Sequence, residues 1–278
     1  MTTTEGWELP ISERELARLT GEMHEAHQDS LPAMRAGALD LTEEIRARAA
    51  GAPRDAGRRR FLLGAGGAAV ALTLAACSSG KSGSAPPSSA DASTPSSGAA
   101  SGAASAAASG LYTGDLRVVA LATALENQAV GAYQAALDAA KAGKLGTVPP
   151  AVATFVTTAM AQHADHAKAW NAVLTGAGKP AVTDVPLSNQ ADTVAALGKA
   201  ASVGDVAKLA LALEDQAAQT YLFATYSVTS PAGIATAATI APVEAMHAAI
   251  LNYVLGQYPV PDDFLPVDKA AGPALLTV

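Results

Sequence analysis

Two side chains near the C-terminus have the types and the spacing of metal ligands. Glu244 and His247 stand three residues apart in the apolar run from Ile234 to Leu255, and residues three apart on a helix share one face. A carboxylate and an imidazole that point together into an apolar interior form half of a transition-metal site, because buried charge is tolerated when it coordinates a cation. The other half must come from elsewhere in the chain.

The region after Cys77 uses glutamate and histidine sparingly. Glutamate is ordinarily a common surface residue of helices, but here the surface charge is left to lysine and aspartate. Residues 78–278 contain only three glutamates and three histidines, all of them in long apolar stretches: Glu126, Glu214, Glu244, His163, His166 and His247. The pattern predicts that these six side chains point inward and bind metal.

An internal repeat relates the two halves of this region. Residues 124–129 match residues 212–217 at an offset of 88, and residues 163–166 match residues 244–247 more loosely at an offset of 81. Each half thus supplies one glutamate and then a pair of polar residues at spacing three. We expect two helical hairpins related by a pseudo-twofold axis.

The repeat also aligns two tyrosines. Tyr133 and Tyr221 each follow a glutamate of the repeat by seven residues, which places them on the same helix face two turns further on. They are candidates to hydrogen-bond the ligands or to relay electrons, although a buried tyrosine with a satisfied hydroxyl is the commoner case.

Composition and the spacing of the connecting segments predict an all-α domain. Hydrophobic residues make up 50% of the chain and aromatic residues only 4%, so the core must consist mainly of Ala, Val and Leu in closely packed helices. Short connections within each hairpin make antiparallel neighbours, and a crossover over 176–203 with a short helix near 191–200 joins the hairpins. The expected long helices are 115–142, 149–176, 203–229 and 231–256, followed by a C-terminal coil over 259–278.

Residues 1–57 form a polar leader, interpreted as one or two amphipathic helices interrupted at Pro32. His24 and His27 stand near Glu22 and Glu25 at helical spacing, which is compatible with a small metal site. A solvated helix face is the favoured interpretation, since charged runs are common on exposed helices.

Residues 58–77 have the order of an export signal. Arg58 and Arg59 precede an apolar run of 16 residues, shorter than the ~20 that span a bilayer, and resemble a twin-arginine signal. Residues 74–77 resemble a lipobox, in which Cys77 becomes the lipidated first residue of the mature chain. An uncleaved signal anchor, and ordinary cleavage that leaves Cys77 unmodified, are the alternatives. The Ser-, Ala-, Gly- and Pro-rich segment 78–110 is expected to be a disordered tether.

Taken together, the repeat and the six residues resemble the ferritin-like superfamily over residues 111–258, and the leader, signal and tether resemble its secreted actinobacterial branch. The resemblance implies a four-helix bundle of two antiparallel hairpins joined by a long crossover, with iron or manganese, one or two ions, as cofactor. It assigns Glu126 and Glu214 as the single carboxylates, Glu244 with His247 as one complete pair, and His166 as the histidine of the other pair.

His163 departs from that pattern, which has a glutamate at this position. Four glutamates balance the charge of two divalent cations, whereas three glutamates and three neutral histidines leave one positive charge. Both a dinuclear and a mononuclear site are therefore open, and the extra imidazole also admits other transition metals.

The resemblance implies an oxidoreductase of the ferroxidase or peroxidase type, anchored by lipid to the outer face of the cytoplasmic membrane, with metal ions and oxygen or peroxide as partners. The alternatives are a lipoprotein that sequesters or delivers metal without turnover, and a metal-free helical interaction module. A net charge of -7 gives no basic surface for nucleic acid. The oligomeric state and any catalytic residue stay open.

Overall fold

The computed structural model describes residues 8–51, 110–260 and 266–278. Arg58, Arg59, Cys77 and nearly all of the expected tether lie outside the described residues, so the export signal and the lipidation site stay predictions. The described secondary structure is entirely helical apart from a single isolated bridge.

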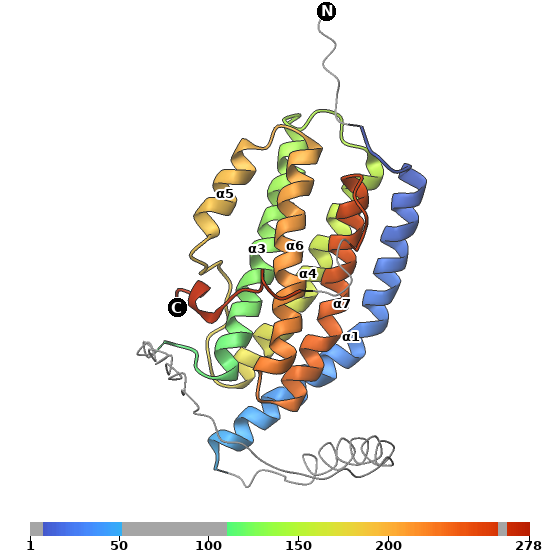
Figure 1. The fold of residues 1–278 in the computed structure, drawn as a ribbon. Helices are drawn as coiled ribbons and strands as arrows, with labels where there is room; N and C mark the ends of the chain where they lie inside the picture. The colour runs from blue at the N-terminus through green and yellow to red at the C-terminus, as the bar shows by residue number, and fades with distance from the viewer. Residues whose placement is uncertain (1–7, 52–109, 261–265) are drawn as a thin grey trace, which may run out of the picture. The chain divides into compact units, whose positions relative to one another are not determined.

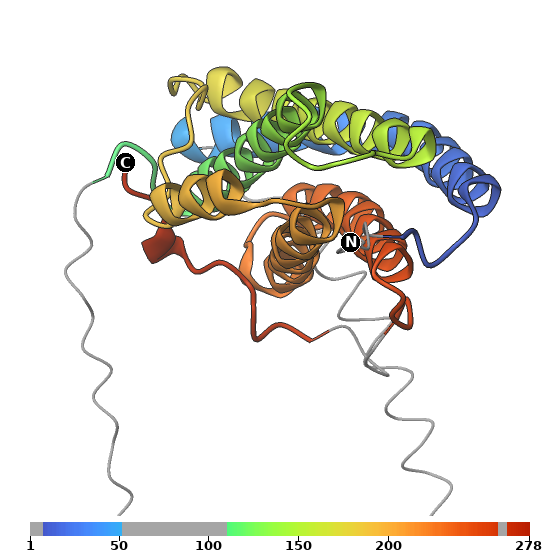
Figure 2. The same ribbon diagram turned by 90° about the horizontal axis from the view of Figure 1, so that it is seen from above.

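Two antiparallel hairpins form the bundle (Figures 1 and 2). The first consists of α3 (Asp115–Lys141) and α4 (Pro150–Gly176), and the second of α6 (Val203–Ser227) and α7 (Pro231–Val254). The crossover between them carries the short helix α5 (Gln190–Lys199), which lies against α3 and α6. The predicted all-α bundle of two hairpins with a long crossover is confirmed.

Capping residues fix where the second hairpin begins and turns. The Ser202 hydroxyl accepts a hydrogen bond from Asp205 N at 3.1 Å at the start of α6, and the Ser230 hydroxyl accepts one from Gly233 N at 3.2 Å at the start of α7. Pro231 occupies the first turn of α7, where its missing N–H costs no helical hydrogen bond. These caps set the register in which α6 and α7 present their side chains.

The N-terminal region forms a single long helix, α1 (Glu13–Ala49), that packs on the bundle. The expected interruption at Pro32 is wrong, because the helix continues through this exposed residue. Leu31 and Met34 are buried on either side of it, and burying an aliphatic side chain contributes about 1.5–3 kcal/mol, enough together to offset the ~3 kcal/mol cost of an interior proline.

Contacts at both ends hold α1 against α4 and α7. Glu13 Oε2 accepts a hydrogen bond from Ala151 N at 3.1 Å at the start of α4, and Arg46 Nε donates to Gly176 O at 2.7 Å at its end. In between, α1 and α7 approach so closely that a Cβ on Gly37 would lie 2.4 Å from Thr236 Oγ1. Helix α1 therefore packs on the four-helix bundle as an additional helix.

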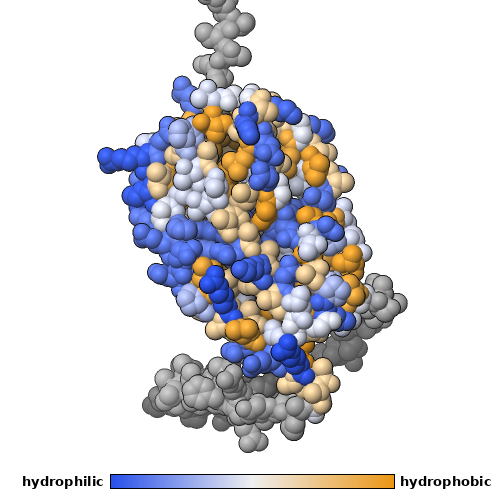
Figure 3. Space-filling model, turned by 180° about the vertical axis from the view of Figure 1, so that it is seen from behind, coloured by the Kyte–Doolittle hydropathy of each residue, from blue (hydrophilic) through white to orange (hydrophobic). Residues whose placement is uncertain are grey.

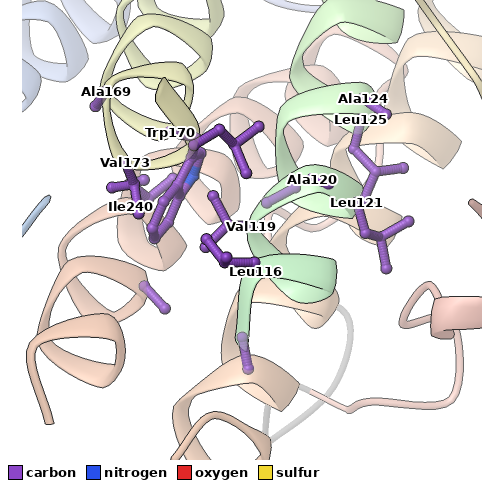
Figure 4. Close-up of a cluster of buried hydrophobic side chains, with 14 of the residues drawn as sticks. Leu116, Val119, Ala120, Leu121, Ala124, Leu125, Ala169, Trp170, Val173 and Ile240 are labelled. Atoms are coloured by element: carbon purple, nitrogen blue, oxygen red, sulfur yellow. The ribbon is translucent and has the colours of Figure 1, made fainter. Parts of the chain in front are cut away.

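The buried apolar side chains divide into two clusters, one toward each end of the bundle. One cluster gathers around Leu121, Trp170 and Ile240 (Figure 4), and the other around Phe155 and Leu251. The six predicted ligands belong to neither cluster and lie on the helices between them. Helix α7 is long and apolar enough to cross a membrane by length and composition, but more than half of it is buried in the bundle.

The C-terminal segment and α5 close the side of α3 and α6. Leu276 forms a bridge with Leu187, and the Gln128 amide donates to Gln190 Oε1 at 2.9 Å at the start of α5. On the face shown in Figure 3, polar and apolar residues intermingle.

Candidate metal centre

The six predicted ligands meet at one level of the bundle, and none exposes more than 1% of its surface: Glu126 from α3, His163 and His166 from α4, Glu214 from α6, and Glu244 and His247 from α7. Their atoms form two overlapping groups in which the candidate ligand atoms lie within 4.8 Å of one another. Burial of three carboxylates and three imidazoles in an apolar bundle is costly unless the charges compensate one another or coordinate a cation.

The first group consists of Glu126, His163, His166 and Glu244. His166 Nδ1 lies 2.8 Å from Glu244 Oε1 and 3.5 Å from Glu126 Oε1. The second group consists of His163, Glu214, Glu244 and His247, and His247 Nδ1 lies 3.2 Å from Glu214 Oε2 and 3.3 Å from Glu244 Oε2. Each hairpin thus supplies ligands to both groups.

His163 stands between the two single glutamates. Its Nδ1 lies 2.7 Å from Glu126 Oε2, and its Nε2 lies 3.1 Å from Glu214 Oε1. The residue that departs from the family pattern therefore occupies the position where a second shared carboxylate is expected, with one ring nitrogen toward each group.

Glu244 provides the test of whether these residues fit a metal. Both of its oxygens are buried, and neither has a hydrogen-bond partner among the residues that the structure describes. His166 Nδ1 is likewise without such a partner, although Glu244 Oε1 is only 2.8 Å away. These two atoms form a close ion pair, and both belong to the group of side chains that could hold an ion. The donor set, carboxylate oxygen and imidazole nitrogen, suits iron, manganese, zinc or copper.

The two tyrosines of the repeat hold the glutamates crosswise. Tyr133 from the first hairpin donates to Glu214 Oε1 of the second, and Tyr221 from the second donates to Glu126 Oε1 of the first. Trp170 Nε1 donates to the Tyr221 hydroxyl at 2.8 Å. Hydrogen bonds from outer residues fix the orientation of ligands and tune their basicity, and the predicted contact of both tyrosines with the ligands is found.

Mutual proximity sets the charges of the metal-free centre. Burial alone would lower the pKa of His166, but the carboxylates of Glu126 and Glu244 outweigh it and raise this pKa to about 9. Burial alone would raise the pKa of Glu126, but the charge of His166 and the contact with His163 lower it to about 2. The same opposition raises the pKa values of His163 and His247. Imidazolium groups thus neutralise the carboxylates, and a metal ion must displace their protons.

Two residues beside the ligands were missed from the sequence. Gln162 Oε1 accepts a hydrogen bond from His247 Nε2 at 2.7 Å, and its place directly before His163 was the only available signal. His27 lies on the buried face of α1, with its ring centroid 5.3 Å from that of His166. Burial and the neighbouring His166 lower the pKa of His27 to about 4, so its imidazole is neutral.

The favoured interpretation of His24 and His27 as parts of one solvated face is therefore wrong for His27 and right for His24, which is exposed. Within the described ranges, neither residue belongs to a cluster of three or more candidate ligands.

Comparison with curated proteins and with solved structures gave no significant match. A family model described as a ferritin-like domain matches residues 114–257, which is just over half of the chain and spans both hairpins with all six candidate ligands. The match agrees with the bundle and with the resemblance seen in the repeat. The chain therefore belongs to the ferritin-like domain family.

Proposed function

We propose that this protein is a di-iron or dimanganese-type redox protein of the cell envelope that oxidises Fe(II) or removes peroxide or oxygen. The observation that carries the proposal is Glu244, a fully buried carboxylate shared by both ligand groups and without a hydrogen-bond partner among the described residues. A buried carboxylate is tolerated where it is paired or coordinates a cation, and Glu244 lies against imidazoles that are themselves candidate ligands.

Five of the six candidate ligands have a defined part in this proposal. Glu126 and His166 would hold one ion, Glu214 and His247 a second, and Glu244 would contact both. A bound iron or manganese ion supplies one-electron chemistry and polarises a coordinated oxygen species. The tyrosines hold the two single glutamates in place. The apolar clusters on either side exclude bulk water, which strengthens the electrostatic interactions between these groups.

Sequestration or delivery of a transition metal without turnover is the second candidate, and His163 favours it. A neutral imidazole at this position leaves one carboxylate too few to balance two divalent ions. A single ion held by histidines and two or three carboxylates satisfies the same residues.

We further propose that the protein is exported and lipid-anchored. The support is the order of Arg58, Arg59, an apolar run and Cys77 in the sequence. Membrane fractions of the host would contain the protein with a lipid on Cys77, detectable by mass spectrometry. A soluble protein with an unmodified Cys77 would contradict the anchor.

The first experiment is elemental analysis of the protein purified from its host without chelators. Two iron or manganese ions per chain, with Fe(II) oxidation or peroxide consumption by the loaded protein, would support the redox function. One ion per chain without turnover would support sequestration or delivery. No metal after reconstitution with iron, manganese, zinc and copper would reject both.

A further inference from the structure

The buried face of α1 contains one residue that its packing does not explain. The buried positions recur every three or four residues, as in a helix that lies along a bundle groove. Among the buried residues of this fully described helix, His27 alone is ionisable; the others are Leu16, Thr20, Met23, Leu31, Met34, Gly37, Ala38, Leu41 and Thr42. An imidazole at this position is less favourable than leucine unless its nitrogen atoms are used.

Two of the three candidate ligand histidines, His166 and His247, differ in what their outer ring nitrogens contact. His247 directs Nδ1 toward Glu214 and Glu244, and its Nε2 contacts Gln162 Oε1 at 2.7 Å. His166 directs Nδ1 toward Glu126 and Glu244 in the same way, but its buried Nε2 has no hydrogen-bond partner among the described residues. A histidine that binds metal through one nitrogen almost always donates a hydrogen bond from the other. The His166 half therefore needs an acceptor.

His27 is the group in position to provide that acceptor. Its Nε2 is also buried and without a partner in the described structure, and its ring lies 5.3 Å from the His166 ring, centroid to centroid. Two imidazoles joined by a direct N–H···N bond of about 3 Å have centroids roughly 5 Å apart. The present centroid separation is therefore compatible with a direct bond once the rings are oriented for it.

We propose that His27 is a positioning residue for the metal ligand His166: when His166 Nδ1 binds metal, His166 Nε2–H donates a hydrogen bond to His27 Nε2. The N-terminal helix then completes the half of the centre that lacks a counterpart of Gln162. This role rests on the metal centre proposed above, and it adds a residue from outside the matched domain.

The chemistry requires one tautomer of His27. If Nε2 accepts, Nδ1 must carry the proton of the neutral ring. Gln28 Nε2 lies 3.4 Å from His27 Nδ1, and a half-turn of this amide would present its oxygen to Nδ1–H instead. Gln28 is exposed and free to make that turn.

The test uses the full chain and Co(II) as a spectroscopic probe. We expect His27→Leu to weaken Co(II) binding by about 10- to 100-fold, the usual effect of losing an outer partner, and to alter the visible ligand-field absorption. Gln162→Leu should weaken binding by a similar factor on the other half. His24→Leu, which changes an exposed histidine three residues away on the same helix, should leave affinity and spectrum unchanged.

A purely structural role for His27 predicts a different result. His27→Leu would then change the stability of the metal-free protein while Co(II) affinity stayed within twofold of wild type, and that result would overturn the proposal. His27→Gln retains an acceptor and should recover most of the affinity.

If the leucine variant does not fold, ¹⁵N NMR of the wild-type protein loaded with Zn(II) decides, because the proposal requires the Nδ1–H tautomer of His27. The Nε2–H tautomer would overturn it. Failure of the wild-type chain to bind Co(II) would reject the metal centre itself, and with it the role of His27.

Discussion

The two halves of the centre have the same inner residues and different surroundings. Around His247, the outer partner Gln162 comes from α4 within the four-helix bundle. Around His166, the adjacent side chain is His27 of α1, almost 140 residues earlier in the chain. The repeat duplicated the tyrosines that hold the single glutamates, but not the residues beside the outer ring nitrogens of His166 and His247. The side chain beside His247 belongs to the ferritin-like domain, whereas the side chain beside His166 belongs to a helix outside it.

The largest expected effect comes from the residue that both halves share. Glu244→Ala removes a ligand from both groups, so metal content measured by elemental analysis should fall more than tenfold while circular dichroism shows an intact bundle. Asp165→Asn is the control, because this carboxylate lies between the histidines in sequence but is directed toward Arg35. Equal metal content in both variants would mean that Glu244 is not a ligand.

A smaller change should make the two halves more alike. His163→Glu supplies a second shared carboxylate between Glu126 and Glu214 and adds the negative charge that two divalent ions require. We expect the number of Co(II) ions bound per chain to rise toward two, with tighter binding of the second. His163→Gln keeps a polar side chain without the charge and should not have this effect. An unchanged stoichiometry in the glutamate variant would show that nuclearity is not limited by this charge.

Removing the hydroxyl of Tyr133 or of Tyr221 should lower the stability of the metal-free protein by different amounts. Tyr133→Phe removes one hydrogen bond to Glu214, worth about 1–2 kcal/mol, whereas Tyr221→Phe also leaves Trp170 Nε1 without its partner, which costs about 1–3 kcal/mol more. Urea unfolding of the metal-free variants should therefore rank Tyr221→Phe as the less stable. Equal losses would indicate that Trp170 finds another acceptor.

The stability of the metal-free protein and its affinity for metal should change in opposite directions as pH rises. His166 has a pKa of about 9 in the folded metal-free protein and an ordinary value of 6.5, so its contribution to stability is complete below pH 6.5 and is lost as pH rises through 9. The free energy of unfolding of the metal-free protein should decrease over this interval. Metal affinity should increase over it, because protons no longer compete for the ligands. Metal-free stability that rises from pH 6.5 to 9 would contradict the assigned charges.

Most of the bundle was predictable because its signals are local. Serine, proline and glycine mark the helix ends, and the observed α6 and α7 begin where expected and end two residues earlier. The burial and grouping of the six candidate ligands were predictable because glutamate and histidine occur at no other position after Cys77. Their convergence followed from the repeat.

The role of α1 was not predictable from the same signals. Pro32 indicated a break, and the charged residues of the segment 1–57 indicated a polar leader of one or two amphipathic helices. The packing of α1 depends on the surface of α4 and α7, which lie more than a hundred residues away in the sequence. Gly37 lies opposite Thr236, and Thr42 lies opposite Gly176, so α1 fits the groove between these helices. The regular spacing of Leu16, Met23 and Leu31 was the available sequence signal, and its period is that of a helix buried on one side.

The packing of α1 on the bundle would be affected by cleavage of the chain at the proposed export signal. Helix α1 precedes Arg58 and the bundle follows Cys77, so cleavage before Cys77 would turn an intramolecular contact into a bimolecular one. The local concentration of α1 at its groove would then fall to the concentration of the free peptide. If the chain is processed as proposed, the uncleaved chain and the cleaved lipoprotein would differ in whether the groove beside His166 is filled.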